Sequence, residues 1–223
     1  ILYNVGEKLG SQKHLQAISS GMMLILPLIV VGALFLVVAN PPINLELVNF
    51  ETAGFFTRFL INWKLWAVEQ YGYLTAPFDV TMGLFGLMSA FTIAYSLAKT
   101  YQLKVNAAII GLASFSMFLL VSAVPVVDGA LSTKFLGADG VFAAIIIALL
   151  TTEIFHLIEV KKWVMKFPSS VPPMVTDFVN SLLPVVLSMT LLYGLNLCFI
   201  GFFGKNFPEL VMQILTPGIT AVN

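Results

Sequence analysis

The chain has 223 residues, with 11 basic and 11 acidic side chains and a formal net charge of zero. Hydrophobic residues make up 59% and charged residues 10%, where soluble globular domains have roughly 45–50% and about 25%. So few charges cannot cover a water-soluble surface, which excludes a free cytosolic enzyme, a disordered chain and a basic protein that binds nucleic acid. The sequence therefore predicts an all-α integral membrane protein.

Five stretches are apolar and long enough to cross the hydrocarbon core of a bilayer, which takes about 20 helical residues. They comprise residues 17–40, 73–98, 105–127, 141–158 and 178–203. The second stretch holds Asp79 near its start, and the fourth ends with Glu153 and His156. We predict five transmembrane helices.

Orientation follows from the basic residues, because cytoplasmic loops carry an excess of Lys and Arg. With the N-terminus inside, the inner segments hold seven basic residues and the outer segments four. The inner seven are Lys8, Lys13, Lys99, Lys104, Lys161, Lys162 and Lys166. We therefore predict a cytoplasmic N-terminus.

Two further stretches are amphipathic. Between the first two spans, aromatic and apolar residues recur at helical spacing from Phe55 to Ala67, which is typical of a helix in the membrane interface. After the fifth span, apolar residues repeat at i, i+3, i+4, i+7 and i+8 from Phe207 to Leu215. Two interpretations of these helices are equally favoured: each lies in the membrane interface, or each covers the rest of this subunit or of a partner subunit.

Small residues repeat every fourth position in two spans and predict close helix packing, since backbone approach through small residues drives association in lipid. The helix-packing candidates are Gly86, Ala90, Ala94, Gly140, Ala144 and Ala148. The pattern favours a tight bundle that extends across a subunit interface.

The sequence lacks the phosphate-binding, dinucleotide-binding, zinc-protease and nucleophile-elbow motifs of soluble enzymes. The single cysteine, Cys198, lies among apolar residues and excludes a disulfide framework within the chain. We assign no catalytic residue, no metal site and no cofactor.

Glu153 and His156 lie at i, i+3 on one face of the fourth span. One interpretation is a proton relay or ligand pair, because ionisable groups inside a membrane are usually functional. We favour a structural ion pair, because both side chains lie near the inner boundary and can extend toward Lys161 and Lys162.

Two aspartates stand near the expected starts of spans. Asp79 follows Pro77 and Asp177 precedes the fifth span, so each is interpreted as an N-terminal cap or dipole partner. Pro172 and Pro173 fit the first turn of the fifth helix, where a missing N–H costs nothing.

Several segments, in this order, resemble the membrane-spanning enzyme IIC of the bacterial phosphotransferase system, in its lactose/cellobiose/chitobiose family. They are Gly10-Ser-Gln-Lys-His-Leu-Gln-Ala-Ile18, Ala94-Tyr-Ser-Leu-Ala-Lys99, residues 136–150, Glu153 with Lys161-Lys162, and Ser170-Val-Pro-Pro173. The chain departs from the family pattern at Ser19-Ser20, Ser169 and His156, which weakens assignment to a particular sugar.

The resemblance implies a homodimeric sugar permease of the bacterial cytoplasmic membrane, about twice this length and not itself an enzyme. Its N-terminal half is a five-helix bundle with the dimer interface, and its C-terminal half holds the sugar. On this mapping, residues 1–205 form the interface domain and residues 206–223 a connector, with the sugar site beyond Asn223. A separate IIB subunit, charged through IIA, phosphorylates the sugar.

Two other functions compete with this one. The chain is alternatively an autonomous proton-linked transporter or channel that uses Glu153 and His156, or a membrane scaffold with no transport role. Sugar uptake that requires phosphoenolpyruvate distinguishes the phosphotransferase permease from the proton-linked transporter and from the scaffold.

Overall fold

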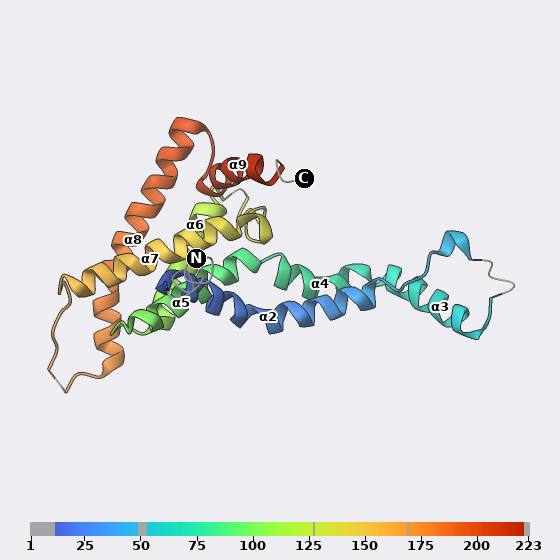
Figure 1. Cartoon of the computed structure of the whole chain (residues 1–223), viewed down its shortest axis with the longest axis horizontal. Helices are drawn as coiled ribbons and strands as arrows, with labels where there is room; N and C mark the ends of the chain where they lie inside the picture. The colour runs from blue at the N-terminus through green and yellow to red at the C-terminus, as the bar shows by residue number, and fades with distance from the viewer. Residues whose placement is uncertain (1–11, 49–52, 127, 169, 221–223) are drawn as a thin grey trace, which may run out of the picture. The chain divides into compact units, whose positions relative to one another are not determined.

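The computed structural model of the chain describes residues 12–48, 53–126, 128–168 and 170–220, with no side-chain description for 217–220. Its described elements are all helical, which confirms the predicted all-α class (Figure 1). They are α2 (Lys13–Ala39), η1 (Leu45–Leu47), α3 (Phe55–Glu69), α4 (Tyr71–Met82), α5 (Phe85–Tyr101), α6 (Ala107–Ser122), η2 (Ala138–Gly140), α7 (Val141–Val160), α8 (Pro173–Phe203) and α9 (Phe207–Thr220).

Four of the five predicted spans are long and apolar enough to cross a membrane: Lys13–Ala39, Tyr71–Tyr101, Ala138–Val160 and Pro173–Phe203. The remaining span is the apolar helix α6, which has 16 residues and is shorter than the predicted 105–127. Its start is fixed by Asn106, whose side chain accepts a hydrogen bond from the N–H of Ala108. It ends at Ser122, three residues before Pro125, which cannot continue a helical ladder.

The second predicted span is not one continuous helix. The chain breaks between α4 and α5 at Gly83 and Leu84, where Leu84 adopts φ −113° and ψ 16°. A methyl group on Gly83 would collide with the carbonyl oxygen of Asp79, so the close turn of backbone there depends on glycine. Asp79 consequently lies in the last turn of α4 and does not cap a helix start, contrary to the sequence interpretation. Pro77 sits inside α4, since the helix already begins at Tyr71.

The chain divides into two compact units, residues 1–25 with 84–223 (unit 1) and residues 26–83 (unit 2). In unit 2, Gly32 of α2 approaches α4 so closely that a methyl group there would collide with the Thr81 hydroxyl. The indole N–H of Trp63 on α3 donates to the carbonyl of Val38 at 3.0 Å. Phe55 and Phe56 on α3 are exposed, 92% and 69%, and therefore available to lipid or to a partner.

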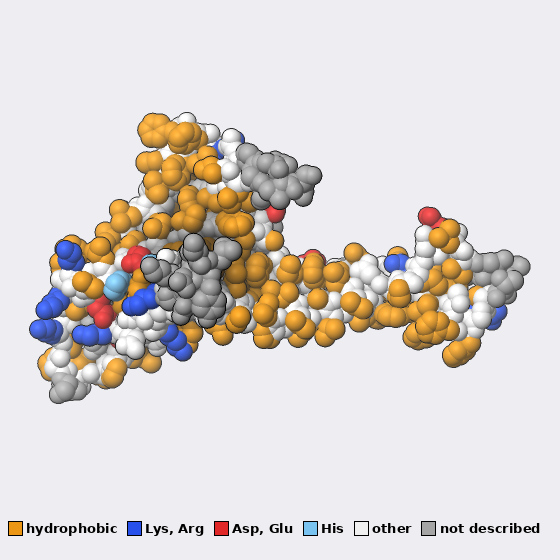
Figure 2. Space-filling model, in the orientation of Figure 1, with side chains coloured by type: hydrophobic (Ala, Val, Ile, Leu, Met, Phe, Trp, Pro, Cys, Tyr) orange, Lys and Arg blue, Asp and Glu red, His pale blue; other side chains and the backbone are white. Residues whose placement is uncertain are grey.

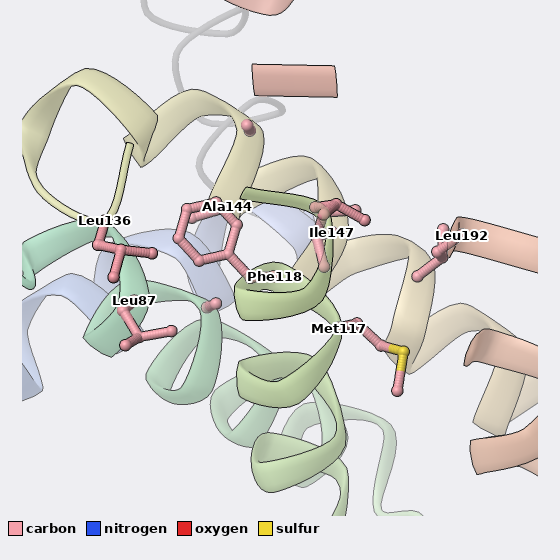
Figure 3. Packing of buried hydrophobic residues seen from close by; sticks show 10 residues of the cluster. Leu87, Met117, Phe118, Leu136, Ala144, Ile147 and Leu192 are labelled. Atoms are coloured by element: carbon pink, nitrogen blue, oxygen red, sulfur yellow. The ribbon is translucent and has the colours of Figure 1, made fainter. Parts of the chain in front are cut away.

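The core of unit 1 is built by α5, α6 and α7, with α8 and α9 packed against them. Side chains from all three helices and from the loop before η2 converge around Phe118, with Leu192 of α8 pointing toward them (Figure 3). The labelled members are Leu87, Met117, Phe118, Leu136, Ala144, Ile147 and Leu192. A second cluster of buried side chains, which includes Ala98 of α5 and Phe155 of α7, packs nearer the ends of these two helices, where the polar residues lie.

The last two helices of unit 1, α8 and α9, are less enclosed than α5 to α7. Only 17% of the apolar stretch of α8 is buried, against 44% for that of α7. Helix α9 matches the predicted amphipathic stretch: Phe207 and Val211 pack against the core, whereas Ile214 is 76% exposed. A large apolar surface therefore remains for lipid or for other protein.

Candidate functional site

Polar side chains from three helices meet at one end of unit 1. His14 lies in the first turn of α2, Tyr101 is the last residue of α5, and Glu153 and His156 lie one turn apart on α7. We call these four residues the Glu153 cluster. The packing of α5 against α7 positions two of its three helices, because that pair makes the most extensive contact in the fold.

Glu153 is the acceptor at the centre of the cluster. Its Oε1 lies 2.5 Å from the Tyr101 hydroxyl and 2.9 Å from His14 Nε2. Its Oε2 lies 3.5 Å from His156 Nδ1. One carboxylate therefore joins α2, α5 and α7.

The geometry assigns the protons. Tyr101 has a single hydroxyl hydrogen, and the short contact gives it to Glu153. His14 Nε2 is also 3.2 Å from the Tyr101 oxygen, so this nitrogen must carry a hydrogen to interact favourably with either oxygen. Three donors thus converge on Glu153, which suits an ionised carboxylate.

Aromatic contacts reinforce the cluster. The rings of Tyr101 and His156 stack with centroids 4.2 Å apart at 20°, and the ring of His14 meets Tyr101 edge-on. The ammonium of Lys13 lies 5.2 Å from the centre of the Tyr101 ring. Lys13 therefore adds a positive charge beside the Tyr101 ring.

The structure brings Glu153 and His156 together, as their spacing predicts, but the other partners of Glu153 differ from the expected Lys161 and Lys162. Among the described residues, no ion pair links Glu153 to Lys161 or Lys162. The Glu153 side chain instead reaches His14 and Tyr101, neither of which was predicted from the sequence to be a site residue. Because three span ends were placed on the same side of the membrane, the topology itself could have indicated this meeting.

The arrangement acts chemically as a tie between helices. Glu153 is 39% exposed and lies in the last two turns of α7, so water reaches the carboxylate at the helix end. Both its oxygens already accept hydrogen bonds. In the described part of the chain, no group of three or more His, Cys, Asp or Glu side chains is arranged to hold a metal ion.

Asp177 is displaced from its expected position at a helix start. Helix α8 begins at Pro173, with Pro172 as its cap residue, so Asp177 lies in the second turn. The cause is the proline pair, because a proline in the first turn favours the helical backbone and starts α8 four residues before Asp177. Asp177 lies instead in the wall of a cavity described below.

The six small residues singled out from the sequence are all buried. A methyl group on Gly86 would stand 2.7 Å from the carbonyl oxygen of Gly137, and one on Gly140 would collide with that of Phe135. Further along the same pair of helices, the Thr152 hydroxyl lies 3.4 Å from the carbonyl oxygen of Ala94. Gly86 and Gly140 therefore let the loop before α7 fold closely on itself and against α5, and the Thr152 contact brings α7 close to α5 nearer the Glu153 cluster.

A family model and individual known proteins that match this chain all point to the same family. The model of the family described as phosphotransferase system, EIIC, matches residues 19–222. The chain is 34% identical over 193 residues to the lichenan permease IIC component of Bacillus subtilis (strain 168), covering 81% of this chain and 39% of that protein. It is 32% identical over 197 residues to the cellobiose-specific EIIC component of Geobacillus stearothermophilus, covering 81% and 40%.

Two further relatives extend the match over almost the whole chain. The lactose-specific EIICB component of Staphylococcus epidermidis is 27% identical over 223 residues, covering 97% of this chain and 35% of that protein. The crystal structure of the transporter ChbC, the IIC component from the N,N'-diacetylchitobiose-specific phosphotransferase system, superposes with a TM-score of 0.79. That match is 28% identical and covers 99% of this chain and 50% of the other. The chain thus spans about two fifths of the curated relatives.

Proposed function

The chain belongs to the phosphotransferase system EIIC family, and from that premise we propose that it is part of a permease that carries a mono- or disaccharide inward for phosphorylation by a IIB subunit. The observation that supports this most strongly is the fold match to a IIC transporter over 99% of the chain. The apolar helices that make the chain a multi-pass membrane protein agree with this role.

Within that permease, residues 1–205 are the scaffold and dimer-forming half, and residues 206–223 are the connector to the sugar-binding half. Support comes from the apolar surfaces of α2 and α8, which are largely exposed. Only 17% of the apolar stretch of each helix is buried. A scaffold that pairs with a second copy needs such faces, because helices associate in lipid through packing of complementary surfaces. The match to 50% of the ChbC chain is consistent with a half-molecule.

The substrate class follows from the names of the relatives, which are permeases for lichenan, cellobiose, lactose and N,N'-diacetylchitobiose. We assign no sugar-binding residue to this chain. Sugar contacts lie beyond Asn223 in this proposal, and the Glu153 cluster acts as a tie between scaffold helices.

The IIB partner, charged by IIA, approaches from the lysine-rich end of unit 1. Lys99, Lys104 and Lys161 all lie at this end, where α5 and α7 finish. The excess of lysine at this end supports a cytoplasmic position for it. The EIICB name of the Staphylococcus epidermidis relative agrees with a IIB partner.

The test measures uptake of labelled cellobiose, lactose and N,N'-diacetylchitobiose into membrane vesicles that carry the full-length gene product. We expect uptake of at least one sugar to require internal phosphoenolpyruvate with the IIA and IIB proteins, and to survive a protonophore. Uptake abolished by the protonophore and independent of phosphoenolpyruvate supports a proton-linked transporter instead. Absence of any sugar uptake favours an inert scaffold.

A second measurement addresses the half-molecule assignment. Native mass spectrometry of the full-length gene product should give a subunit mass near twice the 24.3 kDa of this chain, and a dimer of that subunit. A subunit mass close to 24.3 kDa contradicts the assignment.

A further inference from the structure

A cavity of about 570 Å³ opens at the lysine-rich end of unit 1. Its wall is formed by the segment after α5, the end of α7, the loop that follows α7, and the first turns of α8. The volume falls in the range of small-ligand sites, about 300–1,000 Å³. The Glu153 cluster lies outside it.

Three lysines line this cavity: Lys104 in the segment after α5, and Lys162 and Lys166 in the loop after α7. None of their ammonium groups has a carboxylate within ion-pairing distance in the part of the chain that the structure describes. Two carboxylates share the wall, Glu159 and Asp177. Three positive and two negative groups leave the cavity with one net positive charge.

The two carboxylates have different tasks. Glu159 Oε2 accepts the backbone N–H of Lys104 at 2.9 Å, so it fixes the segment after α5 against α7. Asp177 has no such partner among the described residues, and its oxygens remain available to accept hydrogen bonds. The cavity therefore presents ammonium donors together with one free carboxylate acceptor.

The wall is held in place by its backbone. Lys162 has a left-handed conformation, φ 59°, at the end of α7, where its N–H donates to the carbonyl of Glu159 and that of Trp163 to the carbonyl of Ile158. Glycine is usual at this position of a helix end, because a side chain there is strained. Asn180 of α8 then clamps the loop, accepting from the N–H of Met165 at 2.7 Å and donating to its carbonyl at 3.2 Å.

The cavity lies where the apolar spans end, which is where the phosphate layer of a bilayer is expected. The apolar spans end at Tyr101 and Val160 and resume at Pro173, so the three lysines follow or precede span ends by a few residues. Figure 2 shows basic side chains gathered over this end of unit 1. Trp163 beside them is 60% exposed, as expected of an aromatic residue at the membrane interface.

We propose that this cavity binds the phosphate group of an anionic phospholipid, such as phosphatidylglycerol. The single charge of a phosphodiester matches the net charge of the wall, and lysine-lined pockets at the inner face of a membrane suit such head groups. Asp177 accepts a hydrogen bond from a glycerol hydroxyl. The phosphate of phosphatidylcholine has the same charge, but its quaternary ammonium is repelled by the lysines and offers Asp177 no hydrogen to accept.

The test counts bound phosphatidylglycerol on the full-length gene product by native mass spectrometry, with phosphatidylcholine as the matched lipid. The variants are Lys162→Gly and Lys104→Gln, singly and together. Lys162→Gly removes an ammonium and leaves the residue type that the turn prefers, so the fold should persist. Lys161→Gln is the control, because Lys161 is adjacent and exposed but does not line the cavity.

We expect each cavity variant to bind phosphatidylglycerol about fivefold more weakly, and the double variant about 25-fold, from the attraction of one lysine to an anionic surface. The control should bind as the unmodified protein does. Equal binding by the double variant and the control, or equal binding of the two lipids, overturns the proposal. Melting temperatures measured in detergent show that each variant is folded.

A competition arm identifies the source of the phosphate. Millimolar inorganic phosphate should leave bound phosphatidylglycerol unchanged, because the lipid also gains the burial of its acyl chains. Displacement of the lipid from the unmodified protein but not from the double variant overturns the lipid assignment in favour of a soluble phosphate. Because sugar uptake is not measured here, failure of this proposal leaves the proposed permease function intact.

Discussion

The hydroxyl of Tyr101 at the end of α5 lies 2.5 Å from the carboxylate of Glu153 on α7. The two residues are 52 positions apart in the chain. The same carboxylate receives His14, the second residue of α2. One side chain thus fixes the relative positions of three helix ends.

Tyr101→Phe should lower the free energy of unfolding by about 1 kcal/mol, because it removes a hydrogen bond to a charged but partly exposed acceptor. The ring and its stacking on His156 remain. The control is Tyr95→Phe, since no hydrogen bond of the Tyr95 hydroxyl is present among the described residues and its ring packs on Phe91. Thermal unfolding in detergent compares the two; an equal loss in both contradicts the role of the Tyr101 hydroxyl.

Glu153→Gln should leave the fold and sugar uptake in place. The glutamine oxygen can still accept from Tyr101 and His14, and His156 can change tautomer to accept the amide N–H. We expect a loss of about 1 kcal/mol in stability and uptake that still depends on phosphoenolpyruvate. Abolished uptake in a variant that remains folded would support the proton-linked alternative.

Gly140→Ala should destabilise the bundle by about 1–3 kcal/mol, because the added methyl group would collide with the backbone of Phe135. Gly194→Ala on α8 is the matched control, since nothing lies within 4 Å of a methyl group there. In a helix interior that change is neutral or stabilising by up to about 1 kcal/mol. Equal melting temperatures for the two variants count against close packing at Gly140.

Asn206→Ala should loosen α9. The Asn206 side chain accepts the N–H of Glu209 at 3.0 Å, and Glu209 returns a bond to the N–H of Asn206 at 3.2 Å, a reciprocal cap. Its loss costs about 1 kcal/mol, seen as faster hydrogen exchange at Leu210 to Thr216. Asn206→Asp keeps the acceptor and should exchange like the unmodified chain; protection unchanged in Asn206→Ala would contradict the capping role.

Hydropathy predicted the helical class and the positions of the long spans, because a bilayer demands uninterrupted apolar helix. The boundaries of α2 and α7 and the end of α8 lie within a few residues of those predicted, and α8 begins at Pro173, which was predicted to lie in the first turn of that helix. The break at Gly83 was not predicted. It depends on a backbone approach to Asp79 that no local composition reveals.

The candidate site was half predicted. The i, i+3 spacing identified Glu153 and His156, since neighbours on one helix face are fixed by local geometry. His14 and Tyr101 join them through tertiary packing of three helices, which sequence spacing does not encode. The cavity around Lys104 and Lys162 depends likewise on a loop conformation, including the left-handed Lys162, that composition does not show.

The bond between His14 and Glu153 joins residues 139 positions apart. During synthesis, His14 on α2 therefore leaves the ribosome well before its acceptor on α7. The polar end of α2 stays solvated by water and lipid head groups until α7 has been inserted. The contact that secures α2 to α7 is therefore made only after the intervening helices have been synthesised.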